Sequence, residues 1–481
     1  MNLILIIEIL YVLLVTLVVI RIVYDTDNPT KTAAYILLTV FLPVIGMLVY
    51  FSVGLNYRKK KLYSKKLLID NHRSEEIRRF ISTYRLQSQK ELENQFPNFY
   101  ELNLLYPHKP LGFATGKNQT EILFNGEEKF PELIKALKAA KHHIHIEYYI
   151  YENDKTGNEI AQILIEKAKE GVEVRLIYDD FGSRSIRKTM VPKLRKNGVK
   201  AYPFYEIAFI NFANRINYRN HRKLIIIDAE TCFIGGINIS DKYDNRLKNK
   251  LYWRDMHFKI KGEAAWRMQG IFMADWNFCS GENLQPGLDY FKKHEETPED
   301  NWVQLVSSGP DSEQPEILYT YIQAINSSVK NIYITTPYFV PTVELLSALQ
   351  IAIRKGVEVH ILVPGISDSS IVNAVSKSHY ADLLKAGAKI YLYNKGFVHA
   401  KTMVCDGEVS IIGTANLDHR SFELNFEVNA IVYDKSIATK LQQIFLSDIE
   451  DATQIDSEKW ANRPKTKQFF EKVLRIIGPL M

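Results

Sequence analysis

The hydrophobic pattern divides the chain into an apolar N-terminus and a longer part in which apolar and polar positions alternate. Residues Leu3 to Tyr24 are almost all apolar, and so are residues Ala33 to Leu55. Each stretch is long enough to cross about 30 Å of hydrocarbon at about 1.5 Å per residue. A short polar turn around Pro29 separates them. We predict an N-terminal unit, residues 1–57, with two transmembrane helices at about residues 3–24 and 33–55.

A basic cluster follows the second apolar stretch and orients this unit. It comprises Arg58, Lys59, Lys60, Lys61, Lys65 and Lys66. The positive-inside rule places the cluster in the cytoplasm, so two spans put the turn outside and the N-terminus and all later residues inside. A cleaved signal peptide would be shorter, with a basic start and a small-residue cleavage site. We therefore predict a multi-pass protein of the cell membrane, with its catalytic part cytoplasmic and its basic cluster near anionic lipid headgroups.

Beyond the membrane segments the pattern is typical of an α/β fold. Residues 58–115 read as a basic connector, after which amphipathic helices alternate with apolar strands, as in "IAQILIEKAKEGVEVRLIYDD" and "LLSALQIAIRKGVEVHILVPG". Such alternation indicates helices layered on a sheet. The string Gly-Val-Glu-Val begins at Gly171 and again at Gly356, each time between a helix and a strand. A chain of 481 residues is too long for one ordinary domain, and we expect domains at residues 116–290 and 291–481.

Polar positions show that these two segments are related. The first copy of a motif recurs 178 positions later: His221, Lys223, Asp228, Gly235 and Asn238 match His399, Lys401, Asp406, Gly413 and Asn416. Both copies read H-x-K-x4-D-x6-G-[GT]-x-N. Agreement of polar and glycine positions at one offset indicates an internal repeat. We predict two homologous α/β/α domains related by a pseudo-twofold axis.

The repeated residues suit chemistry on a phosphate group. Side chains two apart on a strand share a face, so each histidine projects with its lysine, and a twofold axis can bring both pairs into one pocket. Lysines stabilise charge that develops on phosphate oxygens, and the amides of Asn238 and Asn416 can donate hydrogen bonds to them. One neutral histidine can attack phosphorus and form a phosphohistidine. The other can protonate the leaving alkoxide and then deprotonate the incoming hydroxyl.

Other interpretations of these residues are weaker. A single H-x-K can simply begin an exposed strand, but two copies with matching Gly and Asn argue against that. Asp228 and Asp406 complete the catalytic motif, yet an odd separation from histidine places them on the other face or at a turn, so we interpret them as structural carboxylates. No metal or other cofactor is expected, because lysine beside each histidine would repel a cation. The three cysteines, Cys232, Cys279 and Cys405, offer no disulfide framework and suit a reducing compartment.

Longer segments around the motifs carry a family resemblance. They are "RNHRKLIIID", "FIGGINISDKY", "YWRDMHFKIKGEAA", "TPYFVP", "GFVHAKTMVCDGEVSIIGTANLDHRSFELNFEVNAIVYD" and, near the N-terminus, "FLPVIGMLVYFSVG". They resemble the phospholipase D superfamily and, within it, the bacterial cardiolipin synthases. The resemblance covers nearly the whole chain and is weakest in residues 62–115 and after about residue 450.

The resemblance implies two phospholipase D-like domains that share one active site. It implies a phosphatidyltransferase that converts two phosphatidylglycerol molecules into cardiolipin and glycerol, without a metal, through a phosphohistidine. A downstream acidic residue is expected to orient each histidine, and the segments "WRDMHF" and "NFEVNA" offer Asp255 and Glu427. Other superfamily members use the first-copy histidine as nucleophile, which favours His221, although symmetry alone gives no preference.

Three alternative functions stay open from the motifs. A phospholipase D that passes the phosphatidyl group to water, giving phosphatidic acid, would use the same intermediate. A nuclease would need a basic groove for the phosphate backbone, whereas much of the clustered charge here lies beside the membrane. A membrane scaffold without activity would leave both motifs idle. The expected partners are phosphatidylglycerol, other anionic phospholipids and the membrane, and not nucleic acid.

The C-terminal segment "PKTKQFFEKVLRIIGPLM" is amphipathic. Phe469, Val473 and Ile476 lie at i, i+4 and i+7, with basic residues around them: Lys465, Lys467, Lys472 and Arg475. Two interpretations are equally favoured. One is a basic helix lying on the membrane surface, and the other is a helix packed against the second α/β domain.

Overall fold

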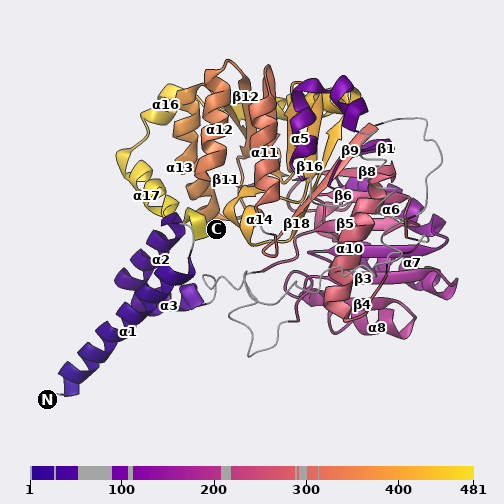
Figure 1. Ribbon diagram of the computed structural model, residues 1–481, viewed down its shortest axis with the longest axis horizontal. Helices are drawn as coiled ribbons and strands as arrows, with labels where there is room; N and C mark the ends of the chain where they lie inside the picture. The colour runs from indigo at the N-terminus through magenta and orange to yellow at the C-terminus, as the bar shows by residue number, and fades with distance from the viewer. Residues whose placement is uncertain are drawn as a thin grey trace.

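The computed structural model describes residues 3–26, 29–51, 89–106, 112–206, 218–285, 287, 290–291, 301–312 and 314–480. An apolar helix projects from a large α/β body, and the C-terminus lies near the junction of the two (Figure 1). The basic cluster at residues 58–66 and most of the predicted connector lie outside the described residues. The described end of the connector forms η3 (Pro97–Phe99) and α5 (Tyr100–Leu104).

The first predicted transmembrane helix is present, whereas the second is broken. Helix α1 (Leu3–Asp25) is the one helix among the described residues that is long and apolar enough to cross a membrane. The next apolar stretch instead forms α2 (Pro29–Phe41) and α3 (Pro43–Val49). Leu42 between them has φ −133° and ψ 67°, because the ring of a proline disfavours helical backbone at the preceding residue. The prediction of one continuous helix over residues 33–55 is therefore not confirmed.

One sheet of fifteen strands runs through the α/β body. Its order is β19-β13-β12-β10-β15-β16-β18-β9-β1-β8-β6-β5-β2-β3-β4. The first-half strands are β1 (Thr115–Phe124), β2 (His143–Tyr148), β3 (Glu173–Tyr178), β4 (Lys200–Pro203), β5 (Lys223–Ile227), β6 (Thr231–Gly235) and β8 (Met256–Gly262). The second-half strands are β9 (Asn301–Ser308), β10 (Asn331–Thr335), β12 (Glu358–Pro364), β13 (Lys389–Tyr393), β15 (Thr402–Cys405), β16 (Val409–Gly413), β18 (Glu427–Tyr433) and β19 (Ala452–Gln454).

The strand order shows the predicted repeat. The antiparallel pair β1–β9 lies at the centre, and on either side of it the order is β8-β6-β5-β2-β3-β4 or β18-β16-β15-β10-β12-β13. Within each flank the hairpin that follows the motif histidine, β5–β6 or β15–β16, occupies the same place. The two halves therefore have one topology and are joined edge to edge into a continuous sheet, while the domain limits at residues 116, 290 and 291 stay predictions.

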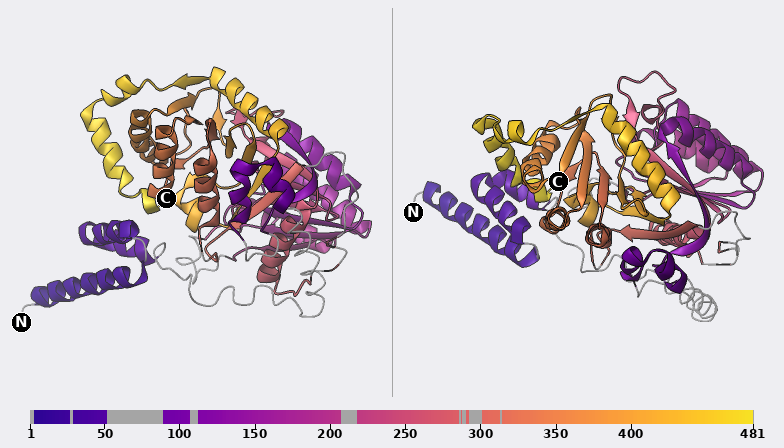
Figure 2. Two further views of the ribbon diagram at one scale, coloured as in Figure 1. Left: turned by 45° about the horizontal axis from the view of Figure 1, so that its top comes forward. Right: turned by 90° about the horizontal axis from the view of Figure 1, so that it is seen from above.

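Helices cover both faces of the sheet (Figures 1 and 2). The first half has α6 (Asn125–Ala139), α7 (Lys155–Lys169), α8 (Met190–Lys196) and α10 (Ala264–Ser280), with η4 (Arg184–Ile186) and η6 (Asp241–Tyr243). The second half has α11 (Glu316–Ser327), α12 (Val343–Arg354), α13 (Ser370–Ala386), α14 (His419–Glu423), α15 (Lys435–Glu450), α16 (Ser457–Ala461), α17 (Lys465–Arg475) and η7 (Gly478–Leu480).

The layers explain why the strand after the first motif is apolar at every position. Successive side chains of a strand alternate between its faces. Leu224 and Ile226 of β5 join the core under α10 and α15, whereas Ile225 and Ile227 join the core under α6, α7 and α8. A strand covered on both faces reads as a continuous hydrophobic run.

Candidate active site

The two motif histidines lie where the halves meet, and each is held by backbone of the other half. The His221 N–H donates to the Phe426 carbonyl at 3.0 Å, and the His399 N–H donates to the Arg254 carbonyl at 2.7 Å. The second contact continues a parallel bridge between β7 (Trp253–Arg254) and β14 (Phe397–Val398). Each histidine therefore depends on both halves for its position.

The acidic residues Asp255 and Glu427 contact the histidines in a crossed arrangement. His399 Nδ1 is hydrogen-bonded to Asp255 Oδ2 at 2.7 Å, and His221 Nδ1 lies 2.8 Å from Glu427 Oε1. The carboxylate that follows each motif thus serves the histidine of the other motif. Both carboxylates are fully buried. A carboxylate on Nδ1 keeps the proton on that nitrogen and leaves Nε2 as the reactive atom.

Lys223 and Lys401 are buried beside the histidines. Lys223 Nζ donates to the His221 carbonyl at 2.6 Å, and Lys401 Nζ lies 2.9 Å from His399 Nδ1. Burial lowers the pKa of Lys223 to about 7, with repulsion from Lys401 opposed by attraction to Glu427. Burial likewise lowers the pKa of Lys401 to about 8, against attraction to Asp255 and Glu427. A neighbouring anion would therefore favour the charged form of both lysines.

Burial disfavours the charged form of both motif histidines. Burial and the charge of Lys401 lower the pKa of His399 to about 3, although Asp255 opposes the shift. Burial also lowers the pKa of His221, and Glu427 opposes that shift. Burial alone would raise the pKa of each carboxylate, but the facing histidine and nearby lysine lower the pKa of Asp255 and of Glu427. The site thus favours ionised carboxylates beside neutral imidazoles.

Aromatic side chains cover the imidazoles, and the sequence analysis did not single them out. Tyr149 meets the His221 ring edge-on at 4.7 Å between centroids, and Trp253 lies 5.0 Å from the His399 ring. Asp179, which is also buried, accepts the Asn220 N–H at 3.1 Å and so holds the segment before His221. Trp253 was visible in "YWRDMHF", two positions before Asp255, where strand periodicity puts it on the same side.

The repeated glycines are packed too closely against neighbouring strands to carry a side chain. A Cβ at Gly235 would lie 2.5 Å from the Met256 carbonyl oxygen, and a Cβ at Gly413 would lie 2.1 Å from Asn429 Oδ1; beside the first, a Cβ at Gly236 would lie 2.2 Å from Asp255 Oδ1. Only glycine allows such close approach. Asn238 Oδ1 accepts the Ile150 N–H at 3.2 Å, and Asn416 is buried, with its own N–H donating to Ser421 Oγ at 3.1 Å. A direct role of either amide in phosphate binding stays a prediction.

Asp228 and Asp406 do not belong with the catalytic residues. Asp228 accepts the N–H groups of Lys141, His142 and His143, and Asp406 those of Val329, Lys330 and Asn331, at 2.7–3.0 Å. Both adopt φ 55° at the hairpin turn. At about 3.3 Å per residue, β5 separates Asp228 from Lys223 by about 16 Å. Their inclusion in the catalytic set is corrected here, while their interpretation as structural carboxylates agrees with this placement.

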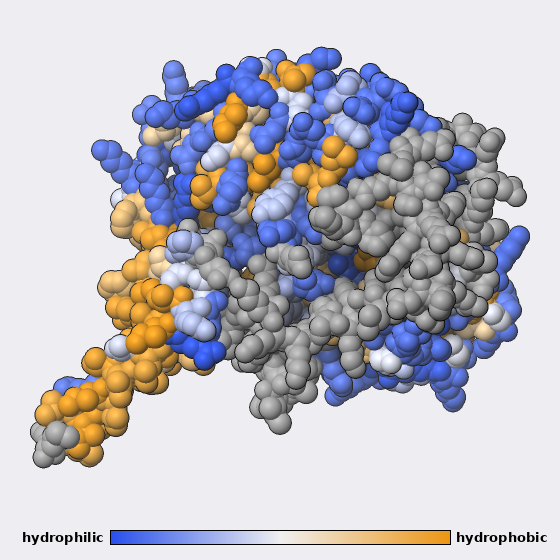
Figure 3. Space-filling model, in the orientation of Figure 1, coloured by the Kyte–Doolittle hydropathy of each residue, from blue (hydrophilic) through white to orange (hydrophobic). Residues whose placement is uncertain are grey.

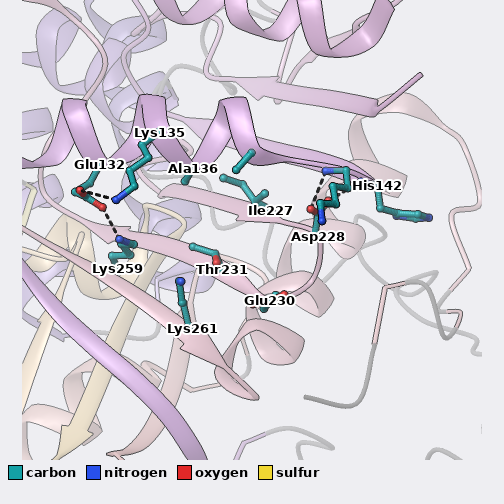
Figure 4. Close-up of a pocket in the computed structure, with 12 residues that line it drawn as sticks. Glu132, Lys135, Ala136, His142, Ile227, Asp228, Glu230, Thr231, Lys259 and Lys261 are labelled. Atoms are coloured by element: carbon teal, nitrogen blue, oxygen red, sulfur yellow. Dashed lines mark hydrogen bonds and ion pairs between the residues drawn. The ribbon is translucent and has the colours of Figure 1, made fainter. Parts of the chain in front are cut away.

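A cavity of about 690 Å³ lies at this remote end of β5. Figure 4 shows Asp228 beside His142 at one side and Lys259 facing Glu132 at the other. Lys259 Nζ lies 2.5 Å from Glu132 and 3.1 Å from Glu121, so its charge is already matched. Neither motif histidine, His221 or His399, lines this cavity, so it is separate from the candidate active site. Within the described part of the chain, no group of three or more His, Cys, Asp or Glu side chains could hold a metal ion.

Comparison with known proteins places this geometry in a family. A family model described as "Cardiolipin synthase, PLD-like domain" matches residues 133–276 and 321–449, and one described as "Phospholipase_D-nuclease N-terminal" matches residues 12–54. A phosphatidylserine synthase structure from Haemophilus influenzae has a TM-score of 0.59 at 15% identity, covering 76% of this chain and 95% of its own. At that identity the likeness concerns the fold alone.

Full-length relatives give the family directly. A cardiolipin synthase of Alkalihalophilus pseudofirmus is 38% identical over 478 residues, covering 98% of this chain and 93% of the relative. A cardiolipin synthase of a Geobacillus species is 40% identical over 471 residues, covering 95% of this chain and 90% of the relative. Both matches extend over the two halves. The chain therefore belongs to the cardiolipin synthase family of proteins with two phospholipase D-like domains.

Proposed function

We infer that this protein synthesises cardiolipin by transferring a phosphatidyl group from one phosphatidylglycerol molecule to another, with release of glycerol. Identity of 38–40% to cardiolipin synthases over nearly the whole chain supports this activity. The observation that carries the mechanism is the crossed pair of histidine–carboxylate contacts. It joins both motifs in one site, as a reaction that needs a nucleophile and an acid on the same phosphorus requires.

The geometry suggests how the two steps divide. Nε2 of one histidine attacks phosphorus, and the bond from phosphorus to the glycerol oxygen breaks. The other imidazole, protonated when the anionic diester enters, donates its proton to that oxygen, and glycerol leaves. A headgroup hydroxyl of the second phosphatidylglycerol then gives its proton to this imidazole and attacks phosphorus, and the phosphorus–nitrogen bond breaks. We propose His221 as the nucleophile, with His399 as the acid and base.

Lys223 and Lys401 neutralise the phosphate oxygens in both steps. Each ammonium is buried, and electrostatic stabilisation is stronger where water is excluded. The diester anion in turn raises the pKa of both lysines and of the acid histidine, because an opposite charge favours the protonated form. Substrate binding thereby favours the protonated form of all three groups.

The membrane determines which acceptor reaches the intermediate. The protein is anchored by the apolar helix α1, and we propose that both α/β halves lie on the cytoplasmic side, in keeping with the basic cluster at residues 58–66. Anchoring holds the site at a high effective concentration of lipid hydroxyls. This favours transfer to phosphatidylglycerol over hydrolysis to phosphatidic acid.

Product analysis tests this function. Purified full-length protein in vesicles of phosphatidylglycerol is expected to form cardiolipin and glycerol in equal amounts, with little phosphatidic acid. Chromatography of the lipids and an enzymatic glycerol assay measure the ratio. If phosphatidic acid were the main product in these vesicles, the protein would be a phospholipase D and not a transferase.

The lysine pKa values predict an alkaline limit to activity. A lysine is charged below its pKa, so kcat/KM should fall as pH rises through about 7 to 8, where Lys223 and Lys401 lose their protons in the free enzyme. Initial rates in phosphatidylglycerol vesicles from pH 5.5 to 9.5 measure the profile. Lys223→Arg should move the start of this fall from about pH 7 to about pH 8, because a guanidinium stays protonated and Lys401 is then the lysine that loses its proton. A flat profile to pH 9.5 would contradict the assignment.

The C-terminal helix combines both interpretations of its sequence. Helix α17 packs on α13, where Arg475 pairs with Asp382 at 2.9 Å. Its other face leaves Phe469 and Phe470 63% and 66% exposed. Figure 2 shows α17 near the membrane helices, and η7 contacts both α17 and α2. We propose that this face lies in the membrane surface.

A fluorescent label should detect that contact. A polarity-sensitive fluorophore on Phe470→Cys in full-length protein is expected to be quenched by spin-labelled lipid in vesicles. The matched control is Ile351→Cys, an exposed apolar position on α12. Equal and weak quenching at both positions would mean that α17 does not contact the membrane and only packs against α13.

A further inference from the structure

The two short apolar helices α2 and α3 fold back on each other. A Cβ at Gly46 would lie 2.5 Å from the Leu38 backbone, a distance that a continuous helix cannot give for residues eight apart. The rings of Tyr35 and Tyr50 lie 5.7 Å apart between centroids, and Tyr50 Oη donates to Asp25 at 2.9 Å. The chain therefore leaves the end of α1 along α2, turns at Pro43 and returns to the same end.

The turn of this hairpin is apolar and exposed. Phe41 is 75% and Val44 69% exposed, and Leu42, Ile45 and Leu48 are also exposed. Figure 3 shows a continuous hydrophobic surface over α1 and the helices beside it. Two N–H groups at the turn are paired within the hairpin: the Leu42 N–H donates to the Leu38 carbonyl at 2.9 Å and the Gly46 N–H to the Leu42 carbonyl at 2.6 Å, while Pro43 has no N–H. A proline that breaks a helix is tolerated in a membrane segment where local backbone adjustments pair the freed groups in this way.

The length of the arms decides how far the hairpin reaches. Helix α2 has 13 residues, which at about 1.5 Å per residue extend about 20 Å. A bilayer core measures about 30 Å. The hairpin is too short to span, whereas α1, with 23 residues, is long enough.

Charged residues lie at the end of these helices that is next to the α/β halves. Arg21 pairs with Asp25 at 2.6 Å at the end of α1, and Lys31 at the start of α2 pairs with Glu423 of α14 at 2.5 Å. No Lys or Arg precedes Arg21. The positive-inside rule then keeps this end, and not the N-terminus, in the cytoplasm.

We propose that α1 crosses the membrane once and that α2–α3 is a re-entrant hairpin in the leaflet that faces the catalytic halves. The N-terminus then lies on the opposite side of the membrane, and the turn near Pro29 lies on the catalytic side, which reverses the two-span topology expected from hydropathy. The base of the hairpin is ion-paired to α14, four residues before Glu427. The hairpin thereby connects the leaflet in which it lies to the histidine site. With the proposed function, this leaflet supplies the phosphatidylglycerol substrate.

Cysteine accessibility tests the topology in full-length protein. Cys279 is replaced by serine, while Cys232 and Cys405 are buried, and single cysteines are placed at Leu3, Thr26, Val44 and the exposed position Ser457 of α16. A membrane-impermeant thiol reagent is applied to intact cells and to inside-out vesicles. We expect Thr26→Cys to label from the same side as Ser457→Cys, Leu3→Cys from the opposite side, and Val44→Cys from neither.

Every other pattern overturns the proposal. If Thr26→Cys were labelled from the side opposite to Ser457→Cys, and Leu3→Cys from the same side as Ser457→Cys, the chain would cross the membrane twice. All three on one side would mean that α1 does not cross, and a reactive Val44→Cys would mean that the hairpin turn is in water. None of these outcomes depends on the reaction that the site catalyses.

A substitution inside the hairpin tests its link to the site. Gly46→Leu should force the arms apart, because even a Cβ meets the Leu38 backbone, and we expect at least a fivefold loss of activity with membrane attachment kept by α1. Val44→Leu, at a lipid-facing position, is the matched control and should stay near wild-type activity. Full activity of Gly46→Leu would show that the close packing of the hairpin does not serve the site.

Discussion

Replacing either His221 or His399 by alanine should abolish cardiolipin formation, with a loss of at least about 10³-fold in kcat. Neither half can work alone, because one phosphorus needs both imidazoles and each is held by the other half. Lys223→Ala and Lys401→Ala should also abolish activity, since each removes a buried positive charge from the phosphate site. Rates of cardiolipin formation in phosphatidylglycerol vesicles measure all four variants.

Trapping the intermediate separates the two histidines. A phosphohistidine is stable to base and labile to acid, so reactions with phosphorus-labelled donor are stopped with detergent at alkaline pH. We expect label on the wild type, none on His221→Ala and some on His399→Ala, where attack still occurs but glycerol leaves slowly. Label on His221→Ala and none on His399→Ala would exchange the two roles. Activity retained by either variant would refute a shared site.

The two halves and the histidine–lysine pairs were predictable from sequence because they depend on short-range patterns. Strands and helices each show a characteristic spacing of apolar residues in the sequence. His221 and Lys223, two positions apart, share one face of a strand whatever surrounds them. The structural role of Asp228 followed in the same way, since its odd spacing from His221 excluded the histidine face. Recurrence at one offset then related the halves without any knowledge of their contacts.

Contacts between distant segments were not predictable in this way. Asp255 and His399 are 144 positions apart, and nothing in either local pattern says which carboxylate faces which histidine. The aromatic cover of Tyr149 and Trp253 depends on the same interface. In the membrane segment, Pro43 and Gly46 were visible, but hydropathy does not distinguish a spanning helix from two short helices folded together.

The crossed contacts predict which variants should resemble each other. Glu427→Gln removes the carboxylate from His221, and Asp255→Asn removes it from His399. An amide no longer holds the Nδ1 proton in place, and such changes cost about 10⁴-fold in a serine protease triad. We expect losses of about 10² to 10⁴-fold in kcat for both variants. Asp451→Asn, at an exposed ion pair with Lys395, is the matched control and should keep activity within about twofold.

The labelling pattern makes this test independent of which histidine attacks. Glu427→Gln should show the same labelling as His221→Ala, and Asp255→Asn the same labelling as His399→Ala. This holds whether His221 or His399 is the histidine that carries the phosphoryl label. With His221 as nucleophile, label fails to form in Glu427→Gln and accumulates slowly in Asp255→Asn. If each carboxylate instead served the histidine of its own motif, Asp255→Asn would share the pattern of His221→Ala. That pairing would contradict the contact between the halves, because the histidine that Asp255 contacts, His399, lies in the second half.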